Sequence, residues 1–409
     1  MHRDLTIERL YRQHSPRVLA TLIRLLGDFE LAEEAMQEAF MAAVQQWPSQ
    51  GVPEHPAAWL IRTGQRRGID QIRRRQTSRH YAHLVVPEEA TVSLDERSIA
   101  HDPLRLLFTC CHPYLALDER VALTLREMCG LTTEQVAHAL LHKPATLAQR
   151  IVRAKRKLRE AGIRYEIPDA RALPERLPDV LRVIYLVFNE GYSQSAGESL
   201  VDVSLSAEAM ELAEALARLL PQGEVLGLQA LMLLHDARRA ARQGAQGELI
   251  PLEEQDRARW DRGRIGEGLT RLAQALALTP TGPYTLQASI AAEHARAPSA
   301  EATDWARIAL LYEALYRRQP SPVVALNRAV AVAMRDGPQA GLALLDALAD
   351  HKAIVNYHLF HAARADLLRR AGDRQAARLA YARALALTIQ QPERRFLQRR
   401  LAELNALEE

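Results

Sequence analysis

The stretch Leu131–Glu160 reads LTTEQVAHALLHKPATLAQRIVRAKRKLRE. Thr132 can cap a first helix, and Gln135, three residues later, completes a capping box. A short turn then leads into a second helix, where Pro144 suits the first position because a missing N–H costs nothing there. Together these signals predict a helix-turn-helix, a motif whose second helix can enter the major groove of DNA.

The second helix of this motif has an apolar face and a basic face. Leu147, Ile151, Ala154 and Leu158 recur at helical spacing and predict its buried stripe. Lys143 to Glu160 contain seven basic residues and one acidic residue. A helix that only had to be soluble would carry both acidic and basic residues, because these form i,i+4 ion pairs. We therefore expect nucleic-acid binding, and a merely solvated basic face is the alternative. The side chains predicted to face DNA are Thr146, Gln149, Arg150, Arg153 and Lys157.

Length and composition predict an all-α protein of two or three domains. The chain has 409 residues, is poor in aromatic residues, and shows no strong alternating β pattern. Its net charge is only +3, yet residues 1–162 hold 23 basic and 19 acidic side chains, whereas the remainder holds 30 and 31. This local basic excess favours specific nucleic-acid faces over a polycation that binds everything.

The cysteines and the apolar runs predict a cytoplasmic protein without a membrane partner. Cys110, Cys111 and Cys129 do not make a disulfide framework, which suits a reducing compartment. Their spacing is also unlike a zinc site, so we expect small buried residues and no metal. The N-terminus lacks the apolar core of a signal peptide, and the longest apolar run, 225–234, is too short to span a bilayer.

A second basic segment, Pro56–Arg75, reads PAAWLIRTGQRRGIDQIRRR. Ile61, Gly68, Ile69 and Ile72 share one side of the predicted helix. A tryptophan among arginines on the other side offers a stacking surface beside phosphate clamps, which suits a strand that is being opened. Burial of Trp59 in the core, with solvated arginines, is the alternative. The residues predicted to contact this strand are Trp59, Arg62, Thr63, Arg66, Arg73 and Arg74.

Upstream of this segment lies an acidic helix, GDFELAEEAMQEAFMAAV, over 27–44, with five acidic residues and no basic one. An inner stripe is expected at Leu31, Ala35, Phe40 and Val44. An acidic face beside a DNA-binding helix would repel phosphate, so it is expected to face a protein, with surface solubility as the alternative. The residues predicted to point outward are Glu33, Glu34, Gln37 and Glu38.

The order of acidic helix, Trp-Leu-x-Arg helix ending in RRR, linker and helix-turn-helix ending in RAKRKLRE resembles the extracytoplasmic-function (ECF) group of bacterial RNA polymerase sigma factors. The resemblance implies that the acidic helix is region 2.2, which grips the clamp helices in the largest subunit of core polymerase. It makes the Trp/Arg helix the part that melts and reads the −10 element, and residues 104–160 the region 4 that binds the −35 element. The −35 contacts then fall on Ala148, Gln149, Arg150 and Arg153.

The segment Pro48–His55 lies where this group holds a flipped −10 base. It is longer than usual in the group and contains prolines, and the common aromatic residue shortly before Trp59 is missing. The resemblance therefore does not identify the preferred −10 bases.

The expected domains are 1–76 (region 2), 77–103 (linker), 104–162 (region 4) and a helical extension over 163–409. The extension is expected to open with the apolar and loop-like stretch VLRVIYLVFNEGYSQSAGESL, followed by helices near 205–220 and 224–242. From about residue 282, helix pairs recur at 284–297 with 304–319, 322–335 with 339–349, and 354–371 with 374–390. Gly337 and Gly372 occupy equivalent turns.

The last helix pair matches the small/large spacing of a tetratricopeptide repeat (TPR). Stacked pairs would leave a concave groove for an unknown ligand or protein. A long TPR-like extension, with FNEGYS near its start, is similar to that of one sigma subfamily, and this implies that the extension regulates activity; a purely structural role is the alternative. The matching residues are Ala365, Leu368, Gly372, Ala377, Tyr381 and Ala384.

Enzyme chemistry is not expected. Asn189, Glu190, Tyr192, Ser193 and Ser195 have no nearby histidine or second carboxylate to act as a base, and no phosphate-binding loop or cofactor motif is present. The sequence therefore predicts a sigma factor with a modulating TPR-like domain. A stand-alone helix-turn-helix activator with a TPR-like sensing domain would leave the acidic and Trp/Arg helices unexplained, and a helical scaffold would leave all basic helices incidental.

Overall fold

The computed structural model describes residues 2–75, 96–140, 142–169, 171–192, 203–245, 247–278 and 280–406. These residues are almost entirely helical, and their only β pairing is an isolated bridge between Gln243 and Leu249. The chain divides into two compact units, Met1–Val187 and Phe188–Glu409. The all-α prediction is confirmed.

The first unit begins with α1 (His2–Leu26), α2 (Phe29–Gln50) and α3 (Pro56–Arg75), which pack on one another. Glycine lets α3 approach α1 closely: a Cβ added at Gly64 would lie 2.8 Å from Leu22 Cδ1, and one at Gly68 would lie 2.5 Å from Leu26 Cδ1. The predicted inner side of α3 is confirmed, because Ile61, Gly68, Ile69 and Ile72 are all buried.

Helix α2 is longer than its sequence suggested. Asp28 caps it by accepting a hydrogen bond from the Leu31 N–H at 2.8 Å, and the helix continues to Gln50. The connection to α3 is therefore only residues 51–55, shorter than the expected loop at 48–55. Val44 is 48% exposed, so its prediction as an inner residue was wrong; helical periodicity instead carries the buried face through Ala43 and Trp47.

Helices α4 (Glu96–Cys110), α5 (Leu117–Glu127), α6 (Thr133–Ala139) and α7 (Pro144–Glu160) follow, and the helix-turn-helix is present as predicted. Thr132 N–H donates to Gln135 Oε1 at 2.8 Å, and Gln135 N–H donates to Thr132 Oγ1 at 3.2 Å, which confirms the capping box. The start of α7 at Pro144 is confirmed, and so is its buried stripe. The expected linker at 77–103 includes the first turns of α4, and its residues 77–95 lie outside the described part of the chain.

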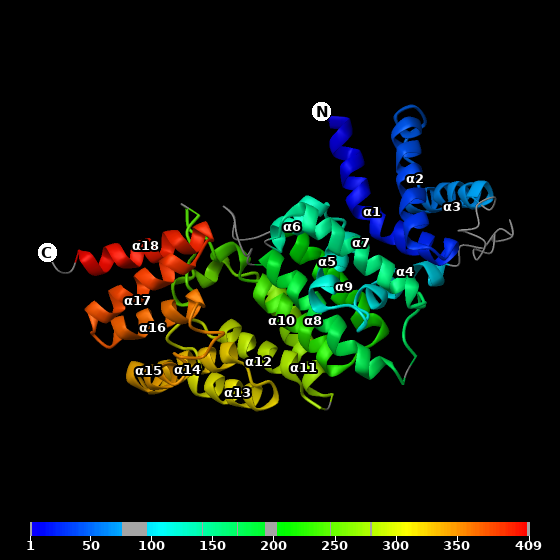
Figure 1. Cartoon of the computed structure of the whole chain (residues 1–409). Helices are drawn as coiled ribbons and strands as arrows, with labels where there is room; N and C mark the ends of the chain where they lie inside the picture. The colour runs from blue at the N-terminus through cyan, green and yellow to red at the C-terminus, as the bar shows by residue number, and fades with distance from the viewer. Residues whose placement is uncertain are drawn as a thin grey trace. The chain divides into compact units, whose positions relative to one another are not determined.

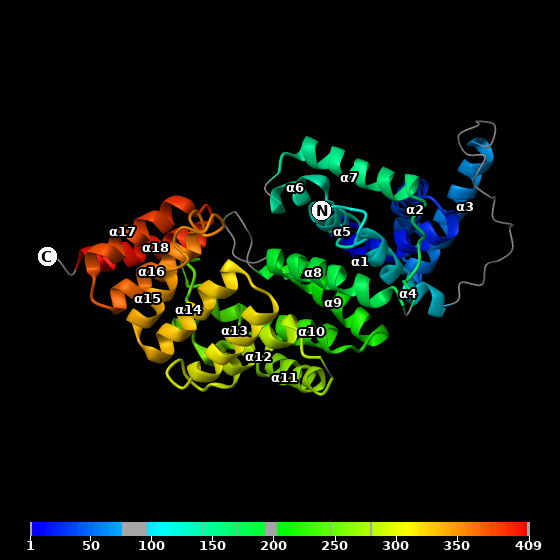
Figure 2. The ribbon, with the colours of Figure 1, turned by 60° about the horizontal axis from the view of Figure 1, so that its bottom comes forward.

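Two polar contacts join α1 and α2 to the helix-turn-helix. Arg24 Nε donates to Asp102 Oδ1 of α4 at 2.8 Å, and the Asp102 side chain is fully buried. Lys155 Nζ of α7 lies 2.7 Å from Glu33 Oε1 of α2 and 2.8 Å from Glu127 Oε1 of α5. Figure 2 shows α7 extending from α6 toward α2 within this unit. The helix that is predicted to read DNA is thus fixed to the acidic helix.

Helix α8 (Leu173–Tyr192) replaces the loop expected at the start of the extension. Val180, Val183, Ile184 and Val187 are all buried and recur at i, i+3, i+4 and i+7, which is the helical pattern that the loop prediction overlooked. The first turns of α8 belong to the first unit, where Arg176 donates to the Phe108 carbonyl oxygen at 2.6 Å. Ser193 and Ser195 lie outside the described residues.

The second unit continues with α9 (Val203–Leu219), α10 (Gly223–Asp236) and α11 (Arg262–Leu276). A long connection between α10 and α11 contains three 3₁₀ turns: η2 (Arg239–Ala241), η3 (Leu252–Glu254) and η4 (Arg257–Arg259). Then come α12 (Pro283–Arg296), α13 (Trp305–Arg318), α14 (Pro322–Asp336), α15 (Pro338–Asp346), α16 (His358–Arg370), α17 (Arg374–Leu387) and α18 (Gln391–Asn405).

Helices α12–α18 form a linear array in which each helix packs on the next (Figure 1, yellow to red). Three small apolar cores succeed one another and share α14 and α16, as in stacked helix pairs. Gly337 and Gly372 have φ values of 99° and 88°, so both turns use the left-handed conformation that favours glycine. The predicted helix pairs are therefore present, and their assignment to the TPR class remains a prediction.

Among the described helices, none is both long and apolar enough to cross a lipid bilayer.

The carboxyl group of Glu127 generates a testable pH dependence. Burial raises its pKa from 4.5 to about 7, against the opposing charge of Lys155. The folded chain therefore keeps a proton that the unfolded chain has already released above pH 4.5. The free energy of unfolding should fall as pH rises from 4.5 to about 7 and should then level off with respect to this group.

The variant Glu127→Gln keeps a neutral side chain of the same shape, so it should lose this part of the pH dependence, a difference of about 1–3 kcal/mol across the window. Urea unfolding of wild type, Glu127→Gln and the control Glu160→Gln, an exposed residue of α7, would measure it at several pH values. Parallel pH profiles for wild type and Glu127→Gln would contradict the assignment.

Candidate nucleic-acid interface

The outward face of α7 presents a mixed polar and basic surface. Its buried stripe fixes the rotation of the helix, so Thr146, Gln149 and Arg153 are exposed. These side chains carry the hydrogen-bond donors and acceptors that recognise base edges in a major groove. Ala148, which the family resemblance added, is half-buried.

Arg150 and Lys157, also predicted to contact DNA, have partners within the helix-turn-helix. Arg150 Nη1 lies 2.9 Å from His142 Nε2 and 3.6 Å from Asp118 Oδ2. Lys157 Nζ donates to both oxygens of Glu119 at 2.7 and 2.9 Å. Both side chains therefore brace α7 against its neighbours, and either one would have to exchange a partner to reach a phosphate.

Glu119 is a capping residue as well as a partner of Lys157. Its carboxylate accepts a hydrogen bond from the Ala116 N–H at 2.9 Å at the start of α5. Although burial disfavours its charge, the hydrogen bonds from Lys157 and Ala116 lower the pKa of Glu119. This carboxylate is therefore a stable anchor for the C-terminal end of α7.

The sequence analysis did not include Val152 among the side chains that face DNA. Its side chain is 61% exposed and lies one turn from Gln149 on the outward face of α7. An exposed methyl pair at this place can contact the methyl group of thymine. The available signal was its position, because Val152 is an apolar residue that falls outside the buried stripe at 147, 151, 154 and 158.

The sequence analysis also assigned no contact to Lys155, a basic residue that lies on the inner side of α7. It follows Ile151 by four residues and precedes Leu158 by three, so its side chain lies along the buried stripe and not on the DNA face. Its ammonium group is also 5.0 Å from the centre of the Phe29 ring. Although burial disfavours its charge, the carboxylates of Glu127 and Glu33 raise its pKa.

The exposed side of α3 carries a row of arginines, as predicted. Arg62, Arg66, Arg73 and Arg74 are exposed, and Thr63 is half-buried. Trp59 is also half-buried, and its ring meets the Trp47 ring edge-on at a centroid distance of 5.4 Å. One part of the indole therefore packs in the protein while another part remains available for stacking.

The four polar residues predicted on α2 separate into two pairs. Glu34 and Gln37 are exposed. Glu38 accepts a hydrogen bond from Gln71 Nε2 at 2.8 Å, which links α2 to α3. Glu33 is 20% exposed because it contacts Lys155. Glu34 and Gln37 are thus the most exposed of the four side chains, and Glu33 is less exposed because of Lys155.

The three cysteines are small buried residues of the helix-turn-helix core. Cys110, Cys111 and Cys129 are all free and buried. Burial raises the pKa of Cys111 to about 12, so its thiol stays protonated. Over the part of the chain that the structure describes, histidine, cysteine and acidic side chains form no group of three that could hold a metal ion.

Comparisons with known proteins divide the chain into the same parts. The family model for sigma-70 region 2 matches residues 10–78, and the model for sigma-70 region 4 matches residues 105–158. Residues 176–276 match a family of unknown function (DUF6596). No solved structure matches the chain.

Two kinds of curated relative are similar to this chain. An uncharacterized protein of Rhizobium meliloti is 44% identical over 403 residues, which cover 96% of this chain and 94% of that protein. The probable ECF RNA polymerase sigma factor SigI, in two strains of Mycobacterium tuberculosis, is 26% identical over 203 residues, covering 48% of this chain and 66% of SigI.

Both sigma-70 regions are present in their expected order, and the helix-turn-helix of the second one is intact. Sigma factors bind core RNA polymerase and promoter DNA, and they direct transcription initiation without catalysing a reaction themselves. The chain therefore carries sigma-70 regions 2 and 4 and is similar to a probable ECF sigma factor, and a helical extension that matches a family of unknown function over residues 176–276 follows its region 4.

Proposed function

We propose that α7 reads the −35 element, that the arginine face of α3 with residues 51–55 captures and opens the −10 element, and that α2 docks on the clamp helices of core polymerase. The observation that carries this proposal is the outward face of α7, where Gln149, Val152 and Arg153 are exposed together. Phosphate contacts supply most of the affinity of such a surface, so promoter binding should weaken steeply with salt.

The contact between Lys155 and Glu33 links the two activities in the free chain. Glu33 lies on the face proposed for core polymerase, while Lys155 belongs to the helix proposed for the −35 element. Docking through Glu33 therefore requires this carboxylate to exchange Lys155 for a partner on polymerase. Glu34, Gln37 and Glu38 can engage polymerase without that exchange.

The extension is proposed to modulate this activity. Its first helix, α8, is anchored on region 4 within the first unit, where Asp179 pairs with Arg120 of α5 at 2.6 Å. This contact gives the extension a direct mechanical connection to the DNA-binding domain. The stacked helices α12–α18 would offer a surface on which a ligand or protein could act.

Run-off transcription with purified core enzyme tests the proposed function. The full-length chain should direct core enzyme alone to discrete start sites on a library of genomic fragments. A stand-alone activator would need another sigma factor in the same reaction. Absence of any start site, together with failure to co-sediment with core enzyme, would refute the proposal.

The substitution Arg153→Ala should weaken −35 recognition by about 1–3 kcal/mol if the guanidinium contacts a base. Footprinting of the holoenzyme on a selected promoter would measure protection at −35, while protection at −10 and core association should not change. Arg164→Ala, which removes an exposed arginine just beyond α7, is the matched control. Equal −35 protection by both variants would remove Arg153 from the interface.

The double substitution Glu34→Lys with Glu38→Lys should weaken association with core enzyme about tenfold or more, because it reverses the charge of the docking face. Co-sedimentation or surface binding to immobilised core would measure the change. Glu211→Lys with Glu267→Lys makes the same charge change at exposed residues of α9 and α11 and should bind normally. If both double variants bind equally well, α2 does not dock on polymerase.

A further inference from the structure

The second unit contains a cavity of about 760 Å³. It lies between the inner side of the array, formed by α13, α14 and α16, and the connection that joins α10 to α11. This volume is within the range of small-molecule binding sites in proteins. The cavity belongs to none of the surfaces that carry the promoter-recognition proposal.

The walls of the cavity are mainly apolar and aromatic. Trp305 and Tyr312 of α13, Val330 of α14 and Leu367 of α16 line it, and Leu252 of the connection covers it. Polar side chains also line it, and among them Asn327 of α14 is an exposed, uncharged amide. Such a lining favours a ligand that buries a ring system and makes one or two hydrogen bonds.

The charged groups at the two ends of the cavity already have partners, and for Arg370 these partners include two carboxylates. Arg370 donates to Asp366 at 2.6 Å, to Glu253 at 2.5 Å and to Met334 Sδ at 3.1 Å. Arg257 donates to the carbonyl oxygens of His294 at 2.5 Å and Ala297 at 2.7 Å. The remaining carboxylate, Glu301, is exposed at the rim.

The ring of His294 adds a neutral polar group to the same wall. It meets Trp305 edge-on at 5.3 Å. Burial, with the nearby charges of Arg238 and Arg257, lowers the pKa of His294 to about 4. His294 therefore adds no charge near neutral pH, and the Arg257 guanidinium beside it already donates to carbonyl oxygens. An ionic ligand would have to displace one of these contacts to find a partner, which disfavours its desolvation.

The connection above the cavity is fixed at both ends and weakly held in the middle. At one end, Leu249 N–H donates to the Pro392 carbonyl and Ile250 N–H to the Arg242 carbonyl, at 3.1 and 2.8 Å. At the other end, buried Arg257 binds the two carbonyl oxygens described above.

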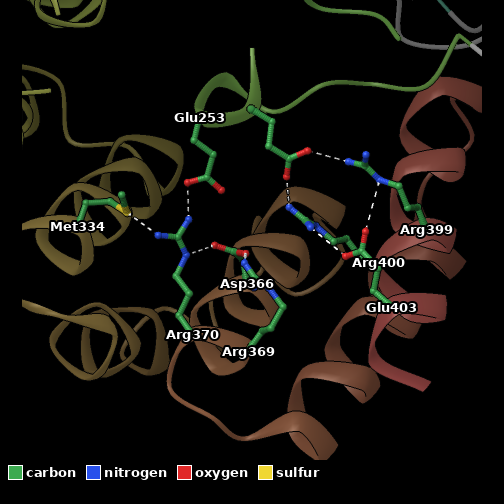
Figure 3. A network of polar contacts seen from close by, with 9 residues as sticks. Glu253, Met334, Asp366, Arg369, Arg370, Arg399, Arg400 and Glu403 are labelled. Carbon is green, nitrogen blue, oxygen red and sulfur yellow. Dashed lines mark hydrogen bonds and ion pairs between the residues drawn. The ribbon is translucent and has the colours of Figure 1, made fainter. Parts of the chain in front are cut away.

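Between these ends, residues 251–254 are held by exposed ion pairs (Figure 3). Glu253 pairs with Arg370, and Glu254 pairs with Arg399 at 2.9 Å and with Arg400. These ion pairs are partly open to solvent, so salt screens them. Screening therefore loosens the hold on this segment while its ends remain attached.

We propose that this cavity binds a neutral small molecule with a ring-containing apolar body, and that residues 251–254 form the lid through which it enters. The proposal names a ligand class for the modulating role that is proposed for the extension. The effect of the ligand on transcription rests on that proposed role, whereas binding itself does not. Binding can be tested on the free chain, so its failure is distinguishable from a failure of promoter recognition.

The probe for the test is N-phenylnaphthylamine, a neutral aromatic molecule that fluoresces when it is desolvated. The full-length chain should bind one equivalent in a saturable manner. Val330→Trp and Ala363→Trp each fill the cavity and should weaken binding about tenfold or more. Val323→Trp, an exposed position on the same helix as Val330, is the matched control and should bind like wild type.

Circular dichroism and thermal melting show which variants are folded. Because the two cavity positions lie on separate helices, one folded variant is enough for the test if the other fails to fold. Absence of saturable binding, or equal binding by all folded variants, would overturn the site. The sulfonate analogue, anilinonaphthalene sulfonate, should bind about tenfold or more weakly than the neutral probe. Equal or tighter binding of the sulfonate would overturn the neutral ligand class.

The lid is tested separately by stopped-flow mixing. Glu253→Gln with Glu254→Gln removes the ion pairs over the cavity and should raise the association rate of the probe several-fold. Raised salt should have the same effect on wild type and little effect on this variant. Glu267→Gln, an exposed residue of α11, is the control. Unchanged association rates would overturn the lid while leaving the cavity as a binding site.

Discussion

The position of α7, the helix that is proposed to read DNA, depends on one buried cation. The ammonium group of Lys155 lies between carboxylates from two other helices, Glu33 and Glu127, and only 10% of its side chain is exposed. A buried ion pair adds little net stability compared with apolar packing, but removing one partner leaves an uncompensated charge and costs about 3–5 kcal/mol. The cluster therefore acts mainly through specificity, because it permits only arrangements of α7, α5 and α2 in which the ammonium group meets both carboxyl groups. The outward face of α7 is defined by this constraint.

The same cluster explains how one small unit presents surfaces of opposite charge. The cations of α7 that point inward are neutralised by Glu33, Glu119 and Glu127, which leaves Arg153 exposed on the outer face. On α2, Glu33 and Glu38 contact neighbouring helices, and Glu34 is exposed. Phosphate is attracted to a basic face and repelled from an acidic one, so the surfaces proposed for DNA and for polymerase are separate. The net charge of the whole chain is only +3 and gives no sign of this separation.

In the second unit, arginines that are paired with carboxylates hold segments of the chain together. Arg370, Arg399 and Arg400 are all engaged by carboxylates of the same unit, and two of these carboxylates belong to the connection above the cavity. Arginines that are matched in this way hold a segment in place and contribute little attraction for phosphate. The basic residues of α3 and α7 and those of the array thus have similar composition but different roles, and the partners of each side chain distinguish them.

The sequence alone determined the features that depend on neighbours within about one helical turn. The capping box at Thr132, the start of α7 at Pro144, the buried stripe at 147–158 and the paired helices with glycine turns at 337 and 372 are all local patterns, and each is present. Tertiary structure decided what depends on residues far apart in the chain. It placed Val44 in solvent, gave Arg150 and Lys157 internal partners, and joined Lys155 to a carboxylate 122 residues away. The cavity also needs residues from 251 to 370 to meet. Helical periodicity can assign a side chain to a face, but the charge or ring that it meets there is fixed only when distant helices pack.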